Sequence, residues 1–278
     1  MSNPLKTGSL TGKRALVTGS SRGIGADTVS YFAGAGATVV VNYRNKEARA
    51  AKLVASLIDA GGSAVAVGAD LTDEASVTAM FATVAETLGG LDMLVMNASG
   101  GMEAGMAADY AMRLNRDAQV ELLTAALPLL APGARVVFVT SHQAHFVHTA
   151  QSLPSYRPVA MSKRAGEDAL RDLIPMLESR NIGFVVVSGD MIEGTITATL
   201  LERSNPGSLG ARKISAGRLY NVSEFAAEVA LAAVEPVPAT HTRYVGDVSG
   251  FVSEFATGEE QTGTEADPGR PSSDMTRR

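Results

Sequence analysis

The sequence predicts an α/β fold in which one doubly wound parallel sheet of about seven strands is flanked by helices. Two observations support this fold class. Short β-branched runs alternate with longer segments of helical periodicity through most of the chain, which implies right-handed crossovers into a single sheet. The composition is rich in alanine, valine and glycine, with 5% aromatic residues and no tryptophan, and so suits helices packed closely on a parallel sheet.

The predicted strands are short apolar runs, as expected for strands buried on both faces. They cover residues 14–18, 38–43, 64–68, 93–97, 135–140, 183–188 and 243–246. Segments of helical periodicity lie between or after them, at residues 24–35, 46–60, 74–88, 109–130, 159–180 and 223–234.

No linker interrupts this alternation, so we predict one domain over residues 1–256. Within it, residues 197–220 are predicted to form a substrate lid, because their small side chains suit a mobile element. Residues 257–278 are predicted to form a flexible polar tail, since they offer almost nothing to bury.

Composition excludes several classes of partner. The chain of 278 residues carries a net charge of −5 without a long basic run, so neither nucleic acid nor a membrane surface is an expected partner. It has no cysteine, which excludes disulfides and thiolate chemistry and fits a reducing compartment. No stretch approaches the roughly 20 apolar residues of a membrane span, and the N-terminus lacks an apolar signal core. We therefore expect a soluble, cytoplasmic protein.

A glycine-rich turn, TGSSRGIG at residues 18–25, follows the first predicted strand and leads directly into a helix. Gly19, Gly23 and Gly25 allow a tight turn, a close approach to a pyrophosphate and close packing of the helix on the strand. The amides at the helix N-terminus would meet the phosphate charge. Because the turn lies between a strand and a helix, it predicts a dinucleotide site on a Rossmann-like fold.

The TGxxxGxG arrangement resembles the short-chain dehydrogenase/reductase family, and the similarity extends over nearly all of residues 10–250. Asp70 and Leu71 end the third strand, where the family contacts the adenine. The segment NASG at residues 97–100 resembles the family's NNAG, with Met96 in place of the first asparagine and Ser99 inserted before the glycine. The resemblance implies a nicotinamide dinucleotide as cofactor.

Charge at the end of the second strand favours NADP(H) over NAD(H). An NAD-specific site places a carboxylate there, which bonds the ribose 2′-hydroxyl and would repel a 2′-phosphate. This chain has Tyr43 at that position, flanked by Asn42 and Arg44, and Arg22 faces it from the glycine loop. Two guanidinium groups without a carboxylate favour the phosphate, because charge-assisted contacts contribute about 1.5–3 kcal/mol each.

The family's catalytic pattern is only partly present. Ser141, after the fifth strand, fits the serine that holds the substrate carbonyl, and Lys163 fits the lysine that binds the nicotinamide ribose. Asn115 stands where the family keeps a structural and catalytic asparagine. The family's tyrosine lies four residues before the lysine, and here that residue is Val159, which cannot donate a proton.

Tyr156, seven residues before Lys163, is the nearest replacement, since close to two helical turns separate them. This tyrosine–lysine spacing resembles enoyl-acyl-carrier reductases, which nevertheless differ in their glycine loop and lack the serine. Pro158 suits the first helical turn and is predicted to hold Arg157 extended, with Tyr156 in the loop before the helix. Three alternatives stay open: Tyr156 as proton donor, another donor such as a histidine or a water, or a weakened catalytic step.

Three of the four histidines lie between Ser141 and Lys163. No carboxylate accompanies them, so no metal site is predicted. We expect His142 and His145 to line the substrate pocket, with His142 best placed to touch the substrate and to exchange protons near neutral pH. After the sixth strand, Ile192 and Thr195 match positions that hold the nicotinamide carboxamide in relatives.

These observations predict an NADPH-dependent oxidoreductase that reduces a ketone or aldehyde, with Ser141, Tyr156, Lys163 and Asn115 as catalytic residues. An enoyl-thioester reductase and a catalytically silent NADP(H)-binding protein are the alternatives. The resemblance also implies a homodimer or homotetramer. The predicted cofactor residues are Gly19, Ser21, Arg22, Gly23, Ile24, Gly25, Asn42, Tyr43, Arg44, Asp70, Leu71, Asn97, Ala98, Ser99, Lys163, Ile192 and Thr195.

Overall fold

Seven parallel strands form one sheet in the order β3-β2-β1-β4-β5-β6-β7, which confirms the predicted fold class. The structure, a computed structural model, describes residues 2–103 and 105–252. The strand order changes direction at β1, which pairs with both β2 and β4, so a crevice opens at the carboxyl ends of these strands. The strands are β1 (Arg14–Val17), β2 (Thr38–Tyr43), β3 (Ser63–Gly68), β4 (Leu91–Met96), β5 (Leu130–Ser141), β6 (Gly183–Gly189) and β7 (Thr242–Val245).

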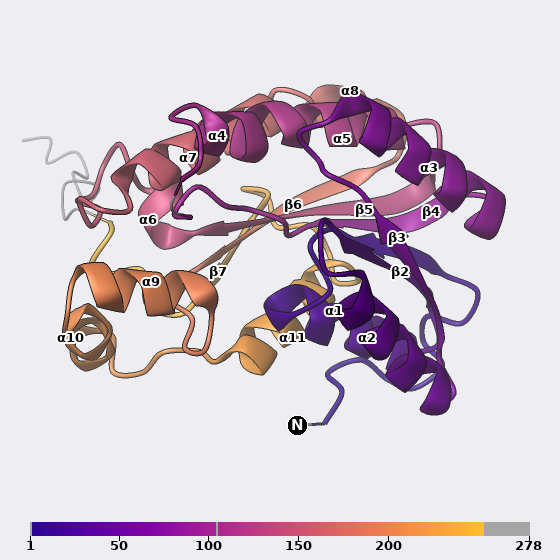
Figure 1. The fold of residues 1–278 in the computed structure, drawn as a ribbon, viewed down its shortest axis with the longest axis horizontal. Helices are drawn as coiled ribbons and strands as arrows, with labels where there is room; N and C mark the ends of the chain where they lie inside the picture. Colours follow the sequence, from indigo (N-terminus) through magenta and orange to yellow (C-terminus); the bar gives the residue numbers. More distant parts are fainter. Residues whose placement is uncertain (1, 104, 253–278) are drawn as a thin grey trace, which may run out of the picture.

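Helices cover both faces of the sheet, as Figure 1 shows. Alternate strand residues serve the two faces: Leu16 and Val40 belong to one buried apolar cluster, while Val17 and Val41 belong to the other. The first face carries α3 (Glu74–Leu88), α5 (Ala118–Ala126), α7 (Arg157–Arg171) and α8 (Ile174–Ser179), and the second carries α1 (Gly23–Gly34), α2 (Glu47–Asp59) and α11 (Val222–Ala232).

Prolines break two helices that the sequence pattern predicts as continuous. The predicted helix at 159–180 divides into α7 and α8 before Pro175, which has no N–H to continue the helical bonding. The predicted helix at 109–130 ends at Ala126, just before Pro128. Its first part consists of α4 (Tyr110–Met112) and a π-helical turn, η1 (Arg113–Asp117).

The predicted extended conformation of Arg157 is wrong. Arg157 begins α7, and Tyr156 before it is also in the right-handed helical region, with φ −99° and ψ −18°. The amides of both residues donate to the carbonyl of Leu153, at 2.8 Å from Tyr156 and 2.9 Å from Arg157, so a turn leads directly into the helix. This bonding outweighs the steric preference that Pro158 imposes on the residue before it.

Three short helices lie where the sequence pattern gave no assignment: α6 (His142–His145), α9 (Ile196–Ser204) and α10 (Ser208–Ser215). The last two fall in the segment predicted as a lid, and Figure 1 shows them apart from the main layers, beyond the ends of β6 and β7. The tail predicted at 257–278 lies outside the described residues. Within the described part of the chain, no helix has the length and apolar character needed to cross a membrane.

Candidate active site

The glycine loop ends at the N-terminus of α1, and no side chain caps that helix. The N-cap residue, Arg22, makes no side-chain hydrogen bond to the first turn, whereas Asp73 caps α3 and Asn221 caps α11. Gly23 has φ of 58°, and a Cβ added there would stand in open space. Uncapped amides beside an open, positively polarised helix end form a cradle for phosphate, so these residues fit a dinucleotide.

Buried polar side chains fix the loop from behind. The Thr18 hydroxyl oxygen accepts hydrogen bonds from the amides of Asn97, at 3.0 Å, and Ala98, at 3.1 Å, which joins the ends of β1 and β4. The side chain of Asn42 accepts a bond of 3.0 Å from the Gly19 amide. A Cβ at Gly25 would lie 2.7 Å from Asn97 Nδ2, so only glycine fits there without movement.

Two adjoining cavities of about 620 and 110 Å³ occupy the crevice. Both are lined in part by Ile24, Asn97 and Tyr156. Ser141, Lys163, Ile192 and Thr195 line the smaller one, at the carboxyl ends of β5 and β6. Predicted cofactor residues that line the larger cavity are Gly19, Ser21, Arg22, Gly23, Ile24, Asn42, Tyr43, Arg44, Asp70, Leu71, Asn97, Ala98, Ser99 and Thr195.

Four cationic side chains line the end of the larger cavity near β2. Arg22 and Arg44 are the predicted pair, and Lys46 and Arg49 at the start of α2 join them. The sequence could also have indicated Lys46 and Arg49, because they follow Arg44 by two and five residues and so lie in the first turn beyond β2. Arg44 also donates to the hydroxyl of Tyr110, which lines the same cavity.

Tyr156 points into the crevice and meets Ser141. The two hydroxyl oxygens lie 3.1 Å apart, and the Tyr156 side chain is buried among residues of α6, α7 and α9. Burial raises the pKa of the Tyr156 phenol above its usual range, while the hydrogen bond to Ser141 opposes that rise. Val159, four residues before Lys163, lies in the wall of the larger cavity and carries no polar atom on its side chain. The structure therefore brings Tyr156 to Ser141 as the phenol of this site.

Lys163 is buried on α7, 7% exposed, and reaches the smaller cavity. Burial lowers its pKa from 10.5 to about 8, while the negative charge of Glu167 acts in the opposite direction. A buried ammonium with a lowered pKa exchanges its proton near neutral pH more readily than an exposed lysine does.

Asn115 lies outside both cavity linings, in η1 behind the loop that follows β4. Its side-chain amide donates to the carbonyl of Gly100 at 2.8 Å and to the hydroxyl of Ser162 at 3.0 Å. The backbone of η1 presses against α7, because a Cβ at Gly166 would lie 1.9 Å from the Asn115 carbonyl oxygen. Asn115 thus ties the loop after β4 to α7, the helix that carries Lys163.

The segment after β6 forms the other wall of the smaller cavity. Thr195 caps α9: its hydroxyl accepts the amide of Ala198 at 3.1 Å and donates to the carbonyl of Ile192 at 2.9 Å. The buried carboxylate of Asp190 is held by the guanidinium of Arg212 on α10, at 2.8 and 3.0 Å. This ion pair fastens the predicted lid to the end of β6.

The family model for short chain dehydrogenases matches residues 13–205 of this chain. The chain belongs to the short-chain dehydrogenase/reductase family. A relative from Aspergillus novofumigatus, the short chain dehydrogenase/reductase nsrJ, is 33% identical over 204 residues, which cover 71% of this chain and 74% of the relative. The hydroxynaphthalene reductase-like protein Arp2 of Metarhizium robertsii is 36% identical over 169 residues, and the match spans only 62% of its length.

Solved structures of this family resemble the whole architecture. The angucycline C-6 ketoreductase LanV with bound NADP is 30% identical, with a TM-score of 0.66 over 83% of this chain and 92% of LanV. A short chain dehydrogenase from Burkholderia cenocepacia J2315 in complex with NADP is 27% identical, with a TM-score of 0.69 over 85% of this chain and 97% of that protein.

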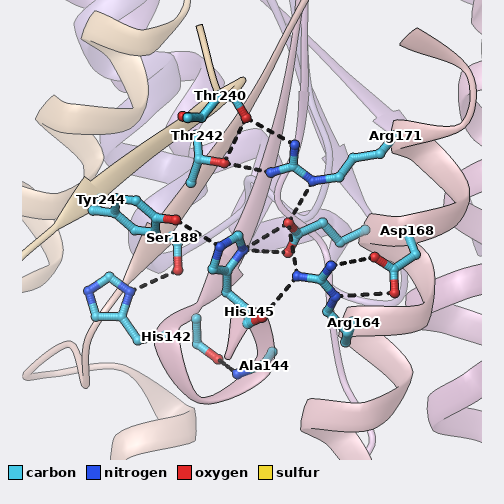
Figure 2. A network of polar contacts seen from close by, with 12 residues as sticks. His142, Ala144, His145, Arg164, Asp168, Arg171, Ser188, Thr240, Thr242 and Tyr244 are labelled. Carbon is cyan, nitrogen blue, oxygen red and sulfur yellow. Dashed lines mark hydrogen bonds and ion pairs between the residues drawn. The ribbon is translucent and has the colours of Figure 1, made fainter. Parts of the chain in front are cut away.

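The structure does not bring His142 and His145 to the cavities, so their expected place in the substrate pocket needs correction. Figure 2 shows both histidines in a polar network that includes residues of α7, β6 and β7. His142 is fully buried, with Nδ1 2.8 Å from the hydroxyl of Ser188, and burial lowers its pKa to about 4. Ser141 faces the cavity, and the next residue along an extended segment points to the opposite side.

Proposed function

We propose that this protein is an NADPH-dependent reductase of a ketone or aldehyde, able to oxidise the corresponding alcohol in reverse. The observation that carries the proposal is the contact of 3.1 Å between the hydroxyls of Ser141 and Tyr156 beside the buried Lys163. Two hydroxyl groups at this distance can both bond one carbonyl oxygen. The LanV structure, whose protein is described as a ketoreductase with bound NADP, supports the same reaction class.

In this reaction each residue of the site would have a separate role. When bound, NADPH supplies a hydride to the carbonyl carbon. Ser141 holds the carbonyl oxygen, and the Tyr156 phenol donates the proton to it. Lys163 orients the nicotinamide ribose and, while charged, favours the ionised form of the phenol after proton transfer. Ile192 and Thr195 would hold the carboxamide, and Asn115 positions α7 from behind through Ser162.

The proposed cofactor is NADP(H) because the end of β2 carries cations and no carboxylate. Arg22, Arg44, Lys46 and Arg49 all line the larger cavity. The carboxylate of Asp70, which lines the same cavity, already accepts two bonds from Thr72, at 2.8 and 2.9 Å. Direct comparison of NADPH with NADH as reductant tests this part, and faster turnover with NADH at equal concentration would contradict it.

The reaction is tested by NADPH oxidation against a panel of ketones, aldehydes and enoyl thioesters. Enoyl thioesters belong in the panel because a Streptomyces collinus relative, 31% identical over 64% of this chain, is described as a 1-cyclohexenylcarbonyl-CoA reductase. We expect turnover with carbonyl compounds, and turnover confined to enoyl thioesters would replace the proposal. Binding of NADPH without any turnover would favour a catalytically silent protein.

The variant Tyr156→Phe tests the proton donor. We expect kcat to fall about 10²- to 10⁴-fold with NADPH binding retained, because the ring stays and only the proton is lost. Tyr31→Phe is the matched control, since the Tyr31 hydroxyl bonds the Ser223 carbonyl at 3.1 Å between α1 and α11, outside both cavity linings. Full activity in Tyr156→Phe would reassign the donor.

Three assignments remain proposals alongside the reaction. They are a single domain over residues 1–256, a substrate lid near residues 197–220 and a homodimer or homotetramer. Sedimentation of the full chain measures the oligomeric state directly.

A further inference from the structure

Tyr156 lies at the end of the segment of residues 146–156, which joins α6 to α7. A residue four places before Lys163 stands inside α7, where the helix fixes the direction of its side chain. Tyr156 precedes the helix as its N-cap residue, so its position also depends on how this segment is held. The contacts of the segment therefore decide where the phenol lies.

The backbone of Leu153 is hydrogen-bonded on both sides within this segment. Its N–H donates to Oε1 of Gln143 at 2.9 Å. Its carbonyl accepts the amides of Tyr156, at 2.8 Å, and Arg157, at 2.9 Å. Two hydrogen bonds in series thus connect the Gln143 side chain on α6 with the backbone of Tyr156.

Only the oxygen of the Gln143 carboxamide can make this contact, because a backbone N–H is a donor and needs an acceptor. No other hydrogen bond forms at the Gln143 side chain within the described residues. The side chain is half-buried, so water competes with the bond less than at the surface. Asn205 of α9 also bonds the Ser155 hydroxyl of the same segment, at 2.6 Å, but in an exposed place. Gln143 is therefore a shielded polar attachment of the segment to α6.

Gln143 and Ser141 belong to the same short stretch of chain. Ser141 caps α6 by accepting the amide of Ala144 at 3.3 Å, and Gln143 is the second residue of that helix. From Gln143 the contacts continue through Leu153 to the backbone of Tyr156. The Tyr156 hydroxyl then lies 3.1 Å from that of Ser141, which closes the path. The start of α6 therefore holds both hydroxyls of the proposed site.

We propose that Gln143 is a positioning residue for Tyr156: through its bond to Leu153, its side-chain oxygen sets where the phenol lies. This inference rests on the role proposed above for Tyr156. A Gln143 that contacted the substrate directly, from its place in the lining of the smaller cavity, would act independently of the phenol. A merely structural Gln143 would stabilise the fold without setting the position of Tyr156.

A double-mutant cycle with the best carbonyl substrate of the panel tests this dependence. We expect Gln143→Leu to lower kcat about 10- to 100-fold, because a misplaced catalytic group costs rate even though it is still present. Gln143→Leu/Tyr156→Phe should turn over no more slowly than Tyr156→Phe alone, since the group that Gln143 positions is already absent. Losses that multiply in the double variant overturn the proposal.

Two further variants separate the hydrogen bond from the change of side chain. Gln143→Glu keeps an acceptor oxygen for the Leu153 amide, so we expect it to retain most of the wild-type kcat. Gln151→Leu makes the same exchange as Gln143→Leu at an exposed position of the same segment, and should keep the wild-type kcat. A loss in either variant as large as that in Gln143→Leu overturns the proposal. If Gln143→Leu does not fold, Gln143→Asn replaces it, because the shorter side chain withdraws the oxygen from Leu153.

NMR of the full chain with ring-labelled tyrosine reports the position of Tyr156 without substrate or turnover. The sequence has six tyrosines, and the resonance lost in Tyr156→Phe identifies the one of interest. We expect this resonance to shift in folded Gln143→Leu and to keep its wild-type place in Gln143→Glu and Gln151→Leu. An unchanged resonance in Gln143→Leu overturns the proposal. Because no turnover is needed, a failure of the reductase assay is distinguishable from a failure of this inference.

Discussion

The proposed proton donor of this site has a different place in the chain from the family's usual one, yet its hydroxyl contacts that of Ser141. Val159 occupies the usual position, and Tyr156, three residues earlier, lies 3.1 Å from Ser141. The turn that bonds Tyr156 and Arg157 to Leu153 makes this possible, because it extends helical geometry one residue before α7 begins. A phenol seven residues before Lys163 then lies on the face of α7 that carries the lysine.

At the residue scale, burial of Lys163 predicts that function is obtained at the expense of stability. The folded-state pKa of Lys163, about 8, lies below the unfolded value of 10.5. Below pH 8 the lysine is therefore protonated in both states, and the native state carries the full free-energy cost of burying the charged ammonium. We expect Lys163→Met to raise the free energy of unfolding at neutral pH by up to about 3 kcal/mol while abolishing turnover.

The stabilisation by Lys163→Met should shrink as the pH rises from 8 to 10.5. Over this range the native wild type buries a neutral amine, and removing the proton from the unfolded lysine costs progressively less. Urea unfolding at neutral pH and near pH 10 measures the difference. Lys52→Met, at an exposed position on α2, is the control and should show no such pH dependence. Equal stabilities of wild type and Lys163→Met at neutral pH would contradict the expectation.

At the residue scale, the sequence could place residues beside strand ends but not residues whose positions depend on packing. The glycine loop, Arg22 and Arg44 line the crevice because a strand end fixes where they lie. That they bind the dinucleotide stays a prediction. The direction of Tyr156 could not be predicted, because its buried neighbours, such as Met191 and Leu219, come from segments distant in sequence.

At the element scale, the sheet was predictable and the helix breaks were less so. Each predicted strand overlaps an observed one, since short apolar runs in this alternation have few alternatives. The division of α7 from α8 has a local signal in Pro175 that a periodicity argument overlooks. The π-helical turn η1 and the helices α9 and α10 have no comparable signal, because their geometry depends on elements packed against them.

The contact between α7 and η1 gives a second prediction. A Cβ at Gly166 would lie 1.9 Å from the Asn115 carbonyl oxygen, so Gly166→Ala must separate two backbones. We expect it to lower the free energy of unfolding by about 1–3 kcal/mol, with a further loss of activity because α7 carries Lys163.

Gly210→Ala on α10 is the matched control, since a Cβ there would meet nothing within 4 Å. Alanine is the better helix former, so this substitution should stabilise the chain by about 0.5–1 kcal/mol. Urea unfolding of both variants decides the matter. A Gly166→Ala chain as stable as Gly210→Ala would show that the two helices can move apart without cost.

A third prediction concerns the attachment of α10. Arg212 holds the buried Asp190 at 2.8 Å and also contacts Asp247 at 3.2 Å after β7. Arg212→Gln leaves the Asp190 carboxylate without its charge partner, and breaking a buried pair in this way costs about 3–5 kcal/mol. We expect faster amide hydrogen exchange in α9 and α10 together with a lower kcat/KM.

Lys213→Gln tests whether that effect is specific. Lys213 pairs with Glu193 at 2.8 Å, but both side chains are partly exposed, at 52% and 32%. Exposed pairs contribute about 0–1 kcal/mol, so exchange in α9 and α10 should stay near that of the wild type. Similar exchange rates in the two variants would mean that Asp190 does not hold α9 and α10 in place.

At the scale of the whole molecule, the topology explains why residues so far apart in sequence share one crevice. The strand order places the carboxyl ends of β1, β4, β5 and β6 in adjacent positions. The glycine loop, the loop after β4, Ser141 and the segment with Asp190 follow these ends in turn. Sequence alternation alone predicts this convergence, because all strands of a doubly wound parallel sheet end at the same edge.

The acid stability of the whole molecule is the last prediction, and it depends on His142. Its folded pKa of about 4 lies below the usual 6.5, because the side chain is buried among Phe146, Tyr244 and Phe251. Between these two values the unfolded chain binds a proton that the native chain does not, so stability rises with pH over this window. Lowering the pH from about 7 to 4 should therefore cost up to about 3 kcal/mol through this residue alone.

His142→Asn removes the titrating ring and keeps a polar group toward Ser188, whose hydroxyl lies 2.8 Å from Nδ1. Urea unfolding at several values between pH 4 and 7 should give a flatter dependence for this variant than for the wild type. His148→Asn, at an exposed position after α6, should keep the wild-type slope. Carboxylates titrate mostly below this window and contribute little to the slope within it. A wild-type slope in His142→Asn would therefore mean that His142 is protonated without global unfolding, through local opening of the segment around α6.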